Sequence, residues 1–167
     1  MNKPAYNALF LCTGNSARSQ MAEALLNMMS DGRFRAYSAG SHPSGFVKPH
    51  ALELIQSVGY PTDSLRSKSW DEFTGPDAPR MDLVITVCDN AAGETCPIWP
   101  GHPAVAHWGV PDPVDGDPHS FKAAWWILRR RVELLLALPM EKLDRLAREQ
   151  RLNQIAETTQ PTETSQA

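Results

Sequence analysis

The sequence predicts a single three-layer α/β domain, in which helices cover both faces of a parallel β-sheet. Short apolar segments that suit strands alternate along the chain with longer segments whose apolar residues recur every three or four positions. Strands that alternate with helices are normally joined by right-handed crossovers, and such connections produce a parallel sheet. The length of 167 residues, of which 42% are hydrophobic, suits one compact domain with some chain left for a tail.

Four segments have the composition of buried strands. The segment "DLVITVC" is the clearest, because its unbroken apolar run is rich in β-branched residues, as expected in the middle of a parallel sheet. "NALFL" and "FRAYSAG" have a similar character, and "AVAHW" is predicted to be a shorter strand. The predicted strands therefore cover residues 7–11, 34–40, 82–88 and 104–108.

Three helices and a C-terminal extension are expected around these strands. In the second helix, Pro49 suits the first turn and Gly59 suits the end. The predicted helices cover residues 19–29, 49–59 and 120–138. We expect the domain to occupy residues 1–139, followed by a charged helical extension over 140–157. Residues 158–167 have neither periodicity nor apolar content and are predicted to be a disordered tail.

The charge of the chain argues against several classes of partner. The formal net charge is −3 and the basic residues are scattered, so no surface for nucleic acid or for a membrane is indicated. No apolar stretch is long enough to span a bilayer, and the first apolar run is too short for the core of a signal peptide. We therefore expect a cytoplasmic protein that binds neither nucleic acid nor membranes.

The chain has three cysteines, Cys12, Cys88 and Cys96, whose roles depend on the expected cytoplasmic location. The reducing cytosol does not favour structural disulfides, so thiols there are buried fillers, metal ligands or redox groups. A metal site is not expected, because the three sulfurs are far apart in the sequence and His102 and His107 lack the spacing of zinc ligands. Packing is the plainest interpretation of a cysteine without further context.

The segment "CTGNSARS" supplies such context for Cys12. It lies just beyond the first predicted strand and before a helix, which is where open parallel sheets bind ligands. Its small residues allow successive backbone N–H groups to turn inward, and the helix N-terminus adds its dipole, so the loop suits an anion. The Arg18 guanidinium matches a tetrahedral oxyanion. Cys12 is then expected to have a lowered pKa and to act as a nucleophile, with Ser19 hydrogen-bonded to its thiolate.

The loop itself is predicted to bind the oxyanion. Asn15 is expected to shape its backbone. The predicted oxyanion-binding residues are Thr13, Gly14, Asn15, Ser16, Ala17, Arg18 and Ser19. Both glycine patterns of nucleotide-binding loops are absent at this turn, which excludes the usual nucleotide sites. A tight turn without function remains the alternative, because a bare C-x5-R spacing arises by chance in many proteins.

This loop resembles the active-site loop of the low-molecular-weight tyrosine phosphatase fold, and more closely that of the arsenate reductases built on this fold. The segments "YSAGSHPSG", "SKSWDEF", "ITVCDNAAGETCPIWPG" and "HWGVPDP" are also similar to the reductase branch, and the resemblance spans residues 7–138. It implies a four-stranded parallel sheet with helices on both faces and no metal or organic cofactor. It also implies arsenate as the substrate, with phosphate or sulfate as competing oxyanions.

The same resemblance implies a disulfide relay. Cys12 forms a thiol–arsenate adduct, Cys88 attacks the Cys12 sulfur with release of arsenite, and Cys96 then attacks Cys88. The resulting Cys88–Cys96 disulfide is reduced by thioredoxin or by glutaredoxin with glutathione. Because Cys88 closes the clearest strand, it is expected at the same sheet edge as Cys12. An idle or packed thiol is the alternative for Cys96.

Asp112 is the candidate general acid. It follows the last predicted strand, and Pro113 after it restricts its backbone. In the family the aspartate of this Asp-Pro pair protonates the leaving oxygen, and the resemblance carries that role to Asp112. Val114 stands where the phosphatases usually have tyrosine, which favours a small inorganic oxyanion over phosphotyrosine. Two other functions stay open: hydrolysis of phosphate esters through a Cys12 phosphoenzyme, and oxyanion binding without catalysis.

Overall fold

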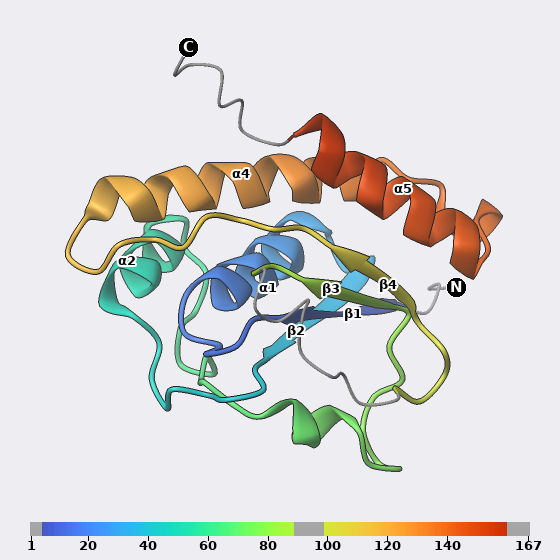
Figure 1. The fold of residues 1–167 in the computed structure, drawn as a ribbon, viewed down its shortest axis with the longest axis horizontal. Coiled ribbons are helices and arrows are strands. Elements are labelled where there is room, and N and C mark those ends of the chain that lie inside the picture. Colours follow the sequence, from blue (N-terminus) through green and yellow to red (C-terminus); the bar gives the residue numbers. More distant parts are fainter. Residues whose placement is uncertain (1–4, 89–98, 160–167) are drawn as a thin grey trace.

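The computed structural model describes residues 5–88 and 99–159. Its sheet has four parallel strands in the order β2-β1-β3-β4 (Figure 1). These strands are β1 (Tyr6–Leu11), β2 (Phe34–Ala39), β3 (Leu83–Thr86) and β4 (Ala104–His107). The predicted α/β class and the four-stranded parallel sheet are therefore confirmed, and every strand lies within about two residues of its predicted bounds.

The strands end level with one another at the carboxyl edge of the sheet. Leu11, at the end of β1, is paired with Ala39 of β2 and with Thr86 of β3. Thr86 is in turn paired with His107, the last residue of β4. Because the four ends share one row, the residues that follow them meet at a single edge, where open parallel sheets bind ligands.

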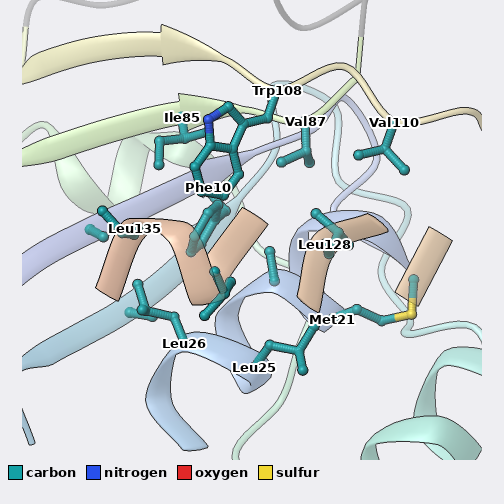
Figure 2. Packing of buried hydrophobic residues seen from close by; sticks show 14 of the residues in the cluster. Phe10, Met21, Leu25, Leu26, Ile85, Val87, Trp108, Val110, Leu128 and Leu135 are labelled. Carbon is teal, nitrogen blue, oxygen red and sulfur yellow. The ribbon is translucent and has the colours of Figure 1, made fainter. Parts of the chain in front are cut away.

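The four described α-helices share one hydrophobic core with one face of the sheet (Figure 1). They are α1 (Arg18–Met29), α2 (Pro49–Ser57), α4 (Pro118–Leu136) and α5 (Arg145–Thr158). Figure 2 shows part of this core, in which Phe10, Ile85, Val87, Trp108 and Val110 meet Met21, Leu25, Leu26, Leu128 and Leu135. Among the helices of the described residues, none is both long enough and apolar enough to cross a membrane.

The opposite face of the sheet is covered by a short 3₁₀ helix, η1 (Trp70–Phe73), and by loops. Side chains alternate between the two faces along a strand, so Phe10 joins the α-helical core whereas Leu9 and Leu11 join the other one. This second cluster contains Leu9, Leu11, Ala39, Phe73, Met81, Val84 and Trp99. Burial on both faces explains the unbroken apolar runs of the strand sequences. Helical segments thus cover both faces, with the described α-helices on one and η1 on the other.

The predicted extension after residue 139 contains two helical segments rather than one. A 3₁₀ turn, η2 (Met140–Lys142), precedes α5. The Asp144 carboxylate accepts a hydrogen bond from the Ala147 amide at 2.8 Å and so caps the start of α5. The helical spacing of the leucines continues across this cap, which is why the pattern predicts one segment. The helix includes Thr158, which was expected in the tail, and the rest of that tail beyond residue 159 lies outside the described residues.

Helix α5 lies along the edge strand β4 (Figure 1). The amides of Val105 and His107 donate to side-chain oxygens of Glu149 at 2.9 Å and Asn153 at 3.3 Å. Just after the strand, the Trp108 indole donates to the Leu152 carbonyl at 2.9 Å. Side chains of α5 thereby satisfy backbone groups that would otherwise be free to pair with a further strand.

Candidate active site

The loop of residues 12–17 joins β1 to α1 at the carboxyl edge of the sheet. The Cys12 amide donates to the Ala39 carbonyl at 3.2 Å, which extends the pairing of β1 with β2 by one residue. Gly40, directly after β2, passes very close to the loop, because a Cβ on it would lie 2.7 Å from the Cys12 carbonyl oxygen. A side chain at position 40 would therefore push the loop away from the sheet.

Four consecutive carbonyl oxygens of the loop accept hydrogen bonds from neighbouring segments. The pairs are His42 N to Thr13 (2.9 Å), Ser44 N to Gly14 (3.0 Å), Gln20 Nε2 to Asn15 (3.1 Å) and Lys48 N to Ser16 (2.8 Å). In a trans peptide the next N–H points the opposite way from the carbonyl, and the described chain has no cis peptide. The amides of residues 14–17 thus point away from the groups that bind these carbonyls, and no described residue accepts from them. Unbonded amides at a strand-to-helix turn can bind an oxyanion.

Asn15 holds the loop in this shape. Its backbone φ is +46°, in the left-handed region that asparagine adopts more readily than most residues. Its buried side chain donates to the Ser19 hydroxyl at 2.8 Å and accepts from the Lys68 amide at 2.9 Å. Ser19 was expected to hydrogen-bond the Cys12 sulfur, but its hydroxyl accepts from Asn15, and no bond to Cys12 is present among the described residues.

The Arg18 side chain connects the loop with the segment that follows β4. Its guanidinium donates to the Val110 carbonyl at 2.8 Å and lies 3.1 Å from the Asp112 carboxylate. The Arg18 side chain is 13% exposed, whereas that of Asp112 is 74% exposed. Arg18 therefore brings Asp112 to the loop, and Asp112 presents its carboxyl group to incoming solutes.

Cys88 lies against the loop, next to Cys12. Its sulfur accepts a hydrogen bond from the Thr13 amide at 3.4 Å and lies 3.8 Å from the Thr13 hydroxyl oxygen. The Cys88 side chain also lies close enough to the Cys12 sulfur to be the largest influence on the pKa of Cys12. Both cysteines are buried, at 6% and 3% exposure. The level strand ends explain the contact, because each cysteine follows the end of its strand by one or two residues.

In this arrangement the Cys12 thiol is harder to ionise than an ordinary cysteine. The hydrogen bond with Cys88 and then burial raise the pKa of Cys12, and they outweigh the Arg18 guanidinium and the Thr13 amide, which lower it. The sequence-based expectation of a lowered pKa is therefore wrong here. That expectation included the field of the anion-binding loop but not a second sulfur in contact with the first.

A buried ion pair that was not predicted from the sequence supports the loop from behind. Lys68 Nζ donates to the Arg66 carbonyl at 2.9 Å and lies 3.8 Å from Glu23 Oε1. The Ser38 hydroxyl donates to Glu23 at 2.6 Å. Burial raises the pKa of Glu23 and lowers that of Lys68, while each charge opposes the shift of the other. The Lys68 backbone also binds Asn15, so the pair anchors a segment that holds the loop.

The segment of residues 66–68 contacts the loop at two further points. The Ser67 hydroxyl donates to the Gly14 carbonyl at 3.0 Å. Gln20 Nε2 bridges the Asn15 carbonyl and the Arg66 carbonyl, the latter at 2.8 Å. Lysine and glutamate are exposed in most proteins, so the sequence offered no signal that Lys68 and Glu23 are buried here.

A cavity of about 240 Å³ lies between the start of α2 and the start of α4. It is lined by Phe46, Lys48, Pro49, His50, Asp115, Gly116 and Phe121. Lys48 and Asp115 form an ion pair of 2.8 Å across it, and Asp117 accepts from the His119 amide at the start of α4. These two aspartates thus have partners away from the loop, whereas Asp112 pairs with Arg18. Val114 is 60% exposed.

Cys96 lies outside the described residues. Within residues 5–88 and 99–159, no group of three or more His, Cys, Asp or Glu side chains is arranged to hold a metal ion. The predicted residues that the structure brings together are Cys12, Cys88, Arg18 and Asp112. Two thiols, loop amides, a guanidinium and a carboxyl group can together bind an oxyanion and attack its central atom, and a reducible oxyanion can then oxidise the sulfur pair.

Comparisons with known proteins agree with this geometry. A family model described as low molecular weight phosphotyrosine protein phosphatase matches residues 7–151, which include the loop, the sheet and the segment of Asp112. "Arsenate reductase 1" of Staphylococcus epidermidis is 35% identical over 113 residues, which are 68% of this chain and 82% of that protein.

Solved structures of arsenate reductases are similar over most of the chain. That from Archaeoglobus fulgidus has a TM-score of 0.64 at 29% identity, with 78% of this chain and 99% of that chain covered. An arsenate reductase in a phosphate-binding state has a TM-score of 0.67 at 28% identity, with 79% and 97% covered. Almost the whole of each relative therefore has a counterpart here, whereas about a fifth of this chain lies outside the match.

Proposed function

The chain belongs to the low-molecular-weight phosphotyrosine protein phosphatase family and, within it, to the arsenate reductases, and on this premise we propose that it reduces arsenate to arsenite. The observation that carries the proposal is the contact of two buried sulfurs, Cys12 and Cys88, at the oxyanion loop. A hydrolase with this loop needs only one thiol. A two-electron reduction needs a second thiol that reaches the first.

Arsenate binds in the loop, in this proposal, with phosphate or sulfate as competing oxyanions. The amides of residues 14–17 donate to its oxygens, and Arg18 adds two parallel donors. The Arg18 guanidinium already faces the loop because the Val110 carbonyl and Asp112 hold it. The relative solved in a phosphate-binding state supports a tetrahedral oxyanion as the ligand. No metal or organic cofactor takes part.

In the first chemical step the Cys12 thiolate attacks arsenic. The proton lost from the Cys12 thiol passes to the Asp112 carboxylate, which delivers it to an arsenic-bound hydroxyl group, and this group leaves as water. The product is a covalent adduct with a bond between Cys12 Sγ and arsenic(V). The raised pKa of Cys12 in the resting structure makes loss of the Cys88 hydrogen bond part of thiolate formation.

In the second step the Cys88 thiolate attacks the Cys12 sulfur. A sulfur–sulfur bond forms while the sulfur–arsenic bond breaks, and the bonding electron pair remains on arsenic. Arsenic(V) thereby becomes arsenic(III) and leaves as arsenite, while the two thiols become a disulfide. The position of Cys88 against Thr13 supports this role, because its sulfur lies at the loop before any substrate binds.

The enzyme is then restored by thiol exchange. Cys96 attacks Cys88, which frees Cys12 and leaves a Cys88–Cys96 disulfide. An external reductant, thioredoxin or glutaredoxin with glutathione, reduces this disulfide. The cytoplasm is the proposed location, because the cycle requires its thiols to be reduced at rest.

A single-turnover experiment tests the proposal. Reduced protein is mixed with one equivalent of arsenate in the absence of any reductant, and arsenite, free thiols and disulfides are then measured, the last by mass spectrometry. We expect two thiols to be lost for each arsenite formed. The Cys96→Ser variant should accumulate a Cys12–Cys88 disulfide, and Cys12→Ser should form no arsenite.

The phosphatase alternative predicts a different result. All three thiols would stay free in arsenate, and a phosphate ester would be hydrolysed equally well by the unmodified protein and by Cys88→Ser. That outcome would reject the reductase and favour hydrolysis through a Cys12 phosphoenzyme. An oxyanion-binding protein without catalysis would show neither arsenite nor hydrolysis.

A further inference from the structure

The segment from the end of β4 to Asp112 makes hydrogen bonds on two sides. On the side of the loop, Arg18 holds the Val110 carbonyl and the Asp112 carboxylate. On the far side, the Trp108 indole donates to the Leu152 carbonyl at 2.9 Å, within the core seen in Figure 2. The next residue along, Gly109, has its carbonyl held at 3.1 Å by Arg131 of α4. Along this short segment the rear contacts, at Trp108 and Gly109, are thus followed directly by the contacts with Arg18, at Val110 and Asp112.

Arg131 is an unusual residue in this position. It is only 1% exposed, and among the described residues no carboxylate lies within ion-pair distance of it. Its guanidinium donates to the Gly109 carbonyl and, at 2.8 Å, to the Thr159 hydroxyl. Burial lowers its pKa to about 10, so it still carries its charge at neutral pH. A buried cation is costly unless its donors are satisfied, which makes both contacts important.

The partners at the end of α5 lie beyond the part of the chain that matches the family. The family model ends at residue 151, whereas the rear contacts come from Leu152, Asn153 and Thr159. The solved relatives are covered over 97–99% of their length by less than four fifths of this chain. These rear contacts therefore come from residues that the family model does not match.

We propose that Arg131 is a positioning residue for Asp112, and that residues 152–159 at the end of α5 hold Arg131 and Trp108 in place for this purpose. The inference rests on the proposed function, because it assigns to Asp112 the proton transfer of the first step. Arg131 fixes the Gly109 carbonyl, and the next carbonyl along the chain, that of Val110, orients Arg18. A shift of this segment by about 1 Å would misplace the acid, and such shifts lower turnover strongly.

A double-mutant cycle tests this coupling. The single-turnover rate of arsenite formation is measured for the unmodified protein, Arg131→Met, Asp112→Asn and the double variant, with thermal melting of each. We expect Arg131→Met to lower the rate about tenfold in the unmodified protein but less than about twofold in the Asp112→Asn background, because a positioning residue has no effect once its target is removed. Arg131→Lys should recover part of the rate, since it keeps a donor for Gly109.

The control is Arg130→Met, on the same helix, where Arg130 is exposed and pairs only with Glu133 among the described residues. It should keep the full rate. If Arg131→Met does not fold, Thr159→Val takes its place in the cycle, with an expected loss of about threefold, because it removes one partner of the guanidinium and leaves the core intact.

The possible outcomes distinguish a failure of the positioning role from a failure of the proposed reductase function. If Asp112→Asn is slow and Arg131→Met lowers the rate by the same factor in both backgrounds, the positioning role is rejected while the reductase mechanism stands. If Asp112→Asn is as fast as the unmodified protein, the acid role of Asp112 fails and this inference fails with it. If no variant or unmodified protein forms arsenite, the proposed function itself is rejected.

Discussion

Replacement of Lys68 by methionine should both destabilise the protein and weaken oxyanion binding. Methionine keeps the volume of the side chain but removes its donors to the Arg66 carbonyl and its charge beside Glu23. Glu23 would then be a buried carboxylate with the Ser38 hydroxyl as its remaining partner among the described residues. The segment of residues 66–68 would also lose the ion pair that holds it next to the loop.

The size of the effect follows from the burial of the pair. Removal of one partner of a buried ion pair costs about 3–5 kcal/mol. Burial already raises the pKa of Glu23, so this carboxyl group can take up a proton when Lys68 is absent, which moves the expected loss to about 3 kcal/mol. The double variant Lys68→Met with Glu23→Gln should recover roughly half of that loss, because no charge is left buried.

Urea unfolding of the variants measures this loss, and phosphate titration measures the loop. Arg66→Met is the matched control, because its exposed pair with Glu72 contributes at most about 1 kcal/mol. We expect Lys68→Met to bind phosphate roughly tenfold more weakly, since Asn15 loses its fixed partner segment, and Arg66→Met to bind it normally. Equal free energies of unfolding for the two variants would show that the buried pair does not stabilise the protein, and equal phosphate affinities would show that it does not support the loop.

Three further changes give measurable results. Cys88→Ala should lower the pKa of Cys12, because Cys88 is the largest cause that raises it, so alkylation of the Cys12 peptide by iodoacetamide should reach its half-maximal rate at a lower pH; an unchanged profile would contradict this. Gly40→Ala should cost about 2 kcal/mol in urea unfolding and weaken phosphate binding, because its Cβ would overlap the loop backbone. Asp144→Ala should cost about 1 kcal/mol in urea unfolding through loss of the α5 cap, whereas its phosphate affinity, measured by the same titration, should stay unchanged.

The fold and the position of the loop were predictable because they depend on local patterns. The apolar runs around Phe10 and Ile85 indicate strands buried on both faces, and the structure shows both faces covered. The spacing from Cys12 to Arg18 describes a strand-to-helix turn, which is a local feature. The break before α5 was missed because the leucine spacing continues through Asp144 and hides the cap.

The properties of buried charges were not predictable in the same way. Glu23 is far from Lys68 in the sequence, as Arg131 is from Gly109, and charged residues are exposed in most proteins. The pKa of Cys12 was predicted in the wrong direction for a related reason. Its largest cause is Cys88, which reaches Cys12 only through the register of β1 and β3. Tertiary contacts therefore decide the electrostatics, while local patterns decide the elements.

The hydrogen bonds between β4 and the side chains of Glu149 and Asn153 affect the resistance of the protein to aggregation. An uncovered outermost strand is a template on which a second polypeptide adds and aggregates. Here the cover is the same helix whose last turns reach the acid-bearing segment. Detachment of this one helix would therefore inactivate the protein and expose an aggregation-prone strand together, so precipitation on heating would not precede loss of activity.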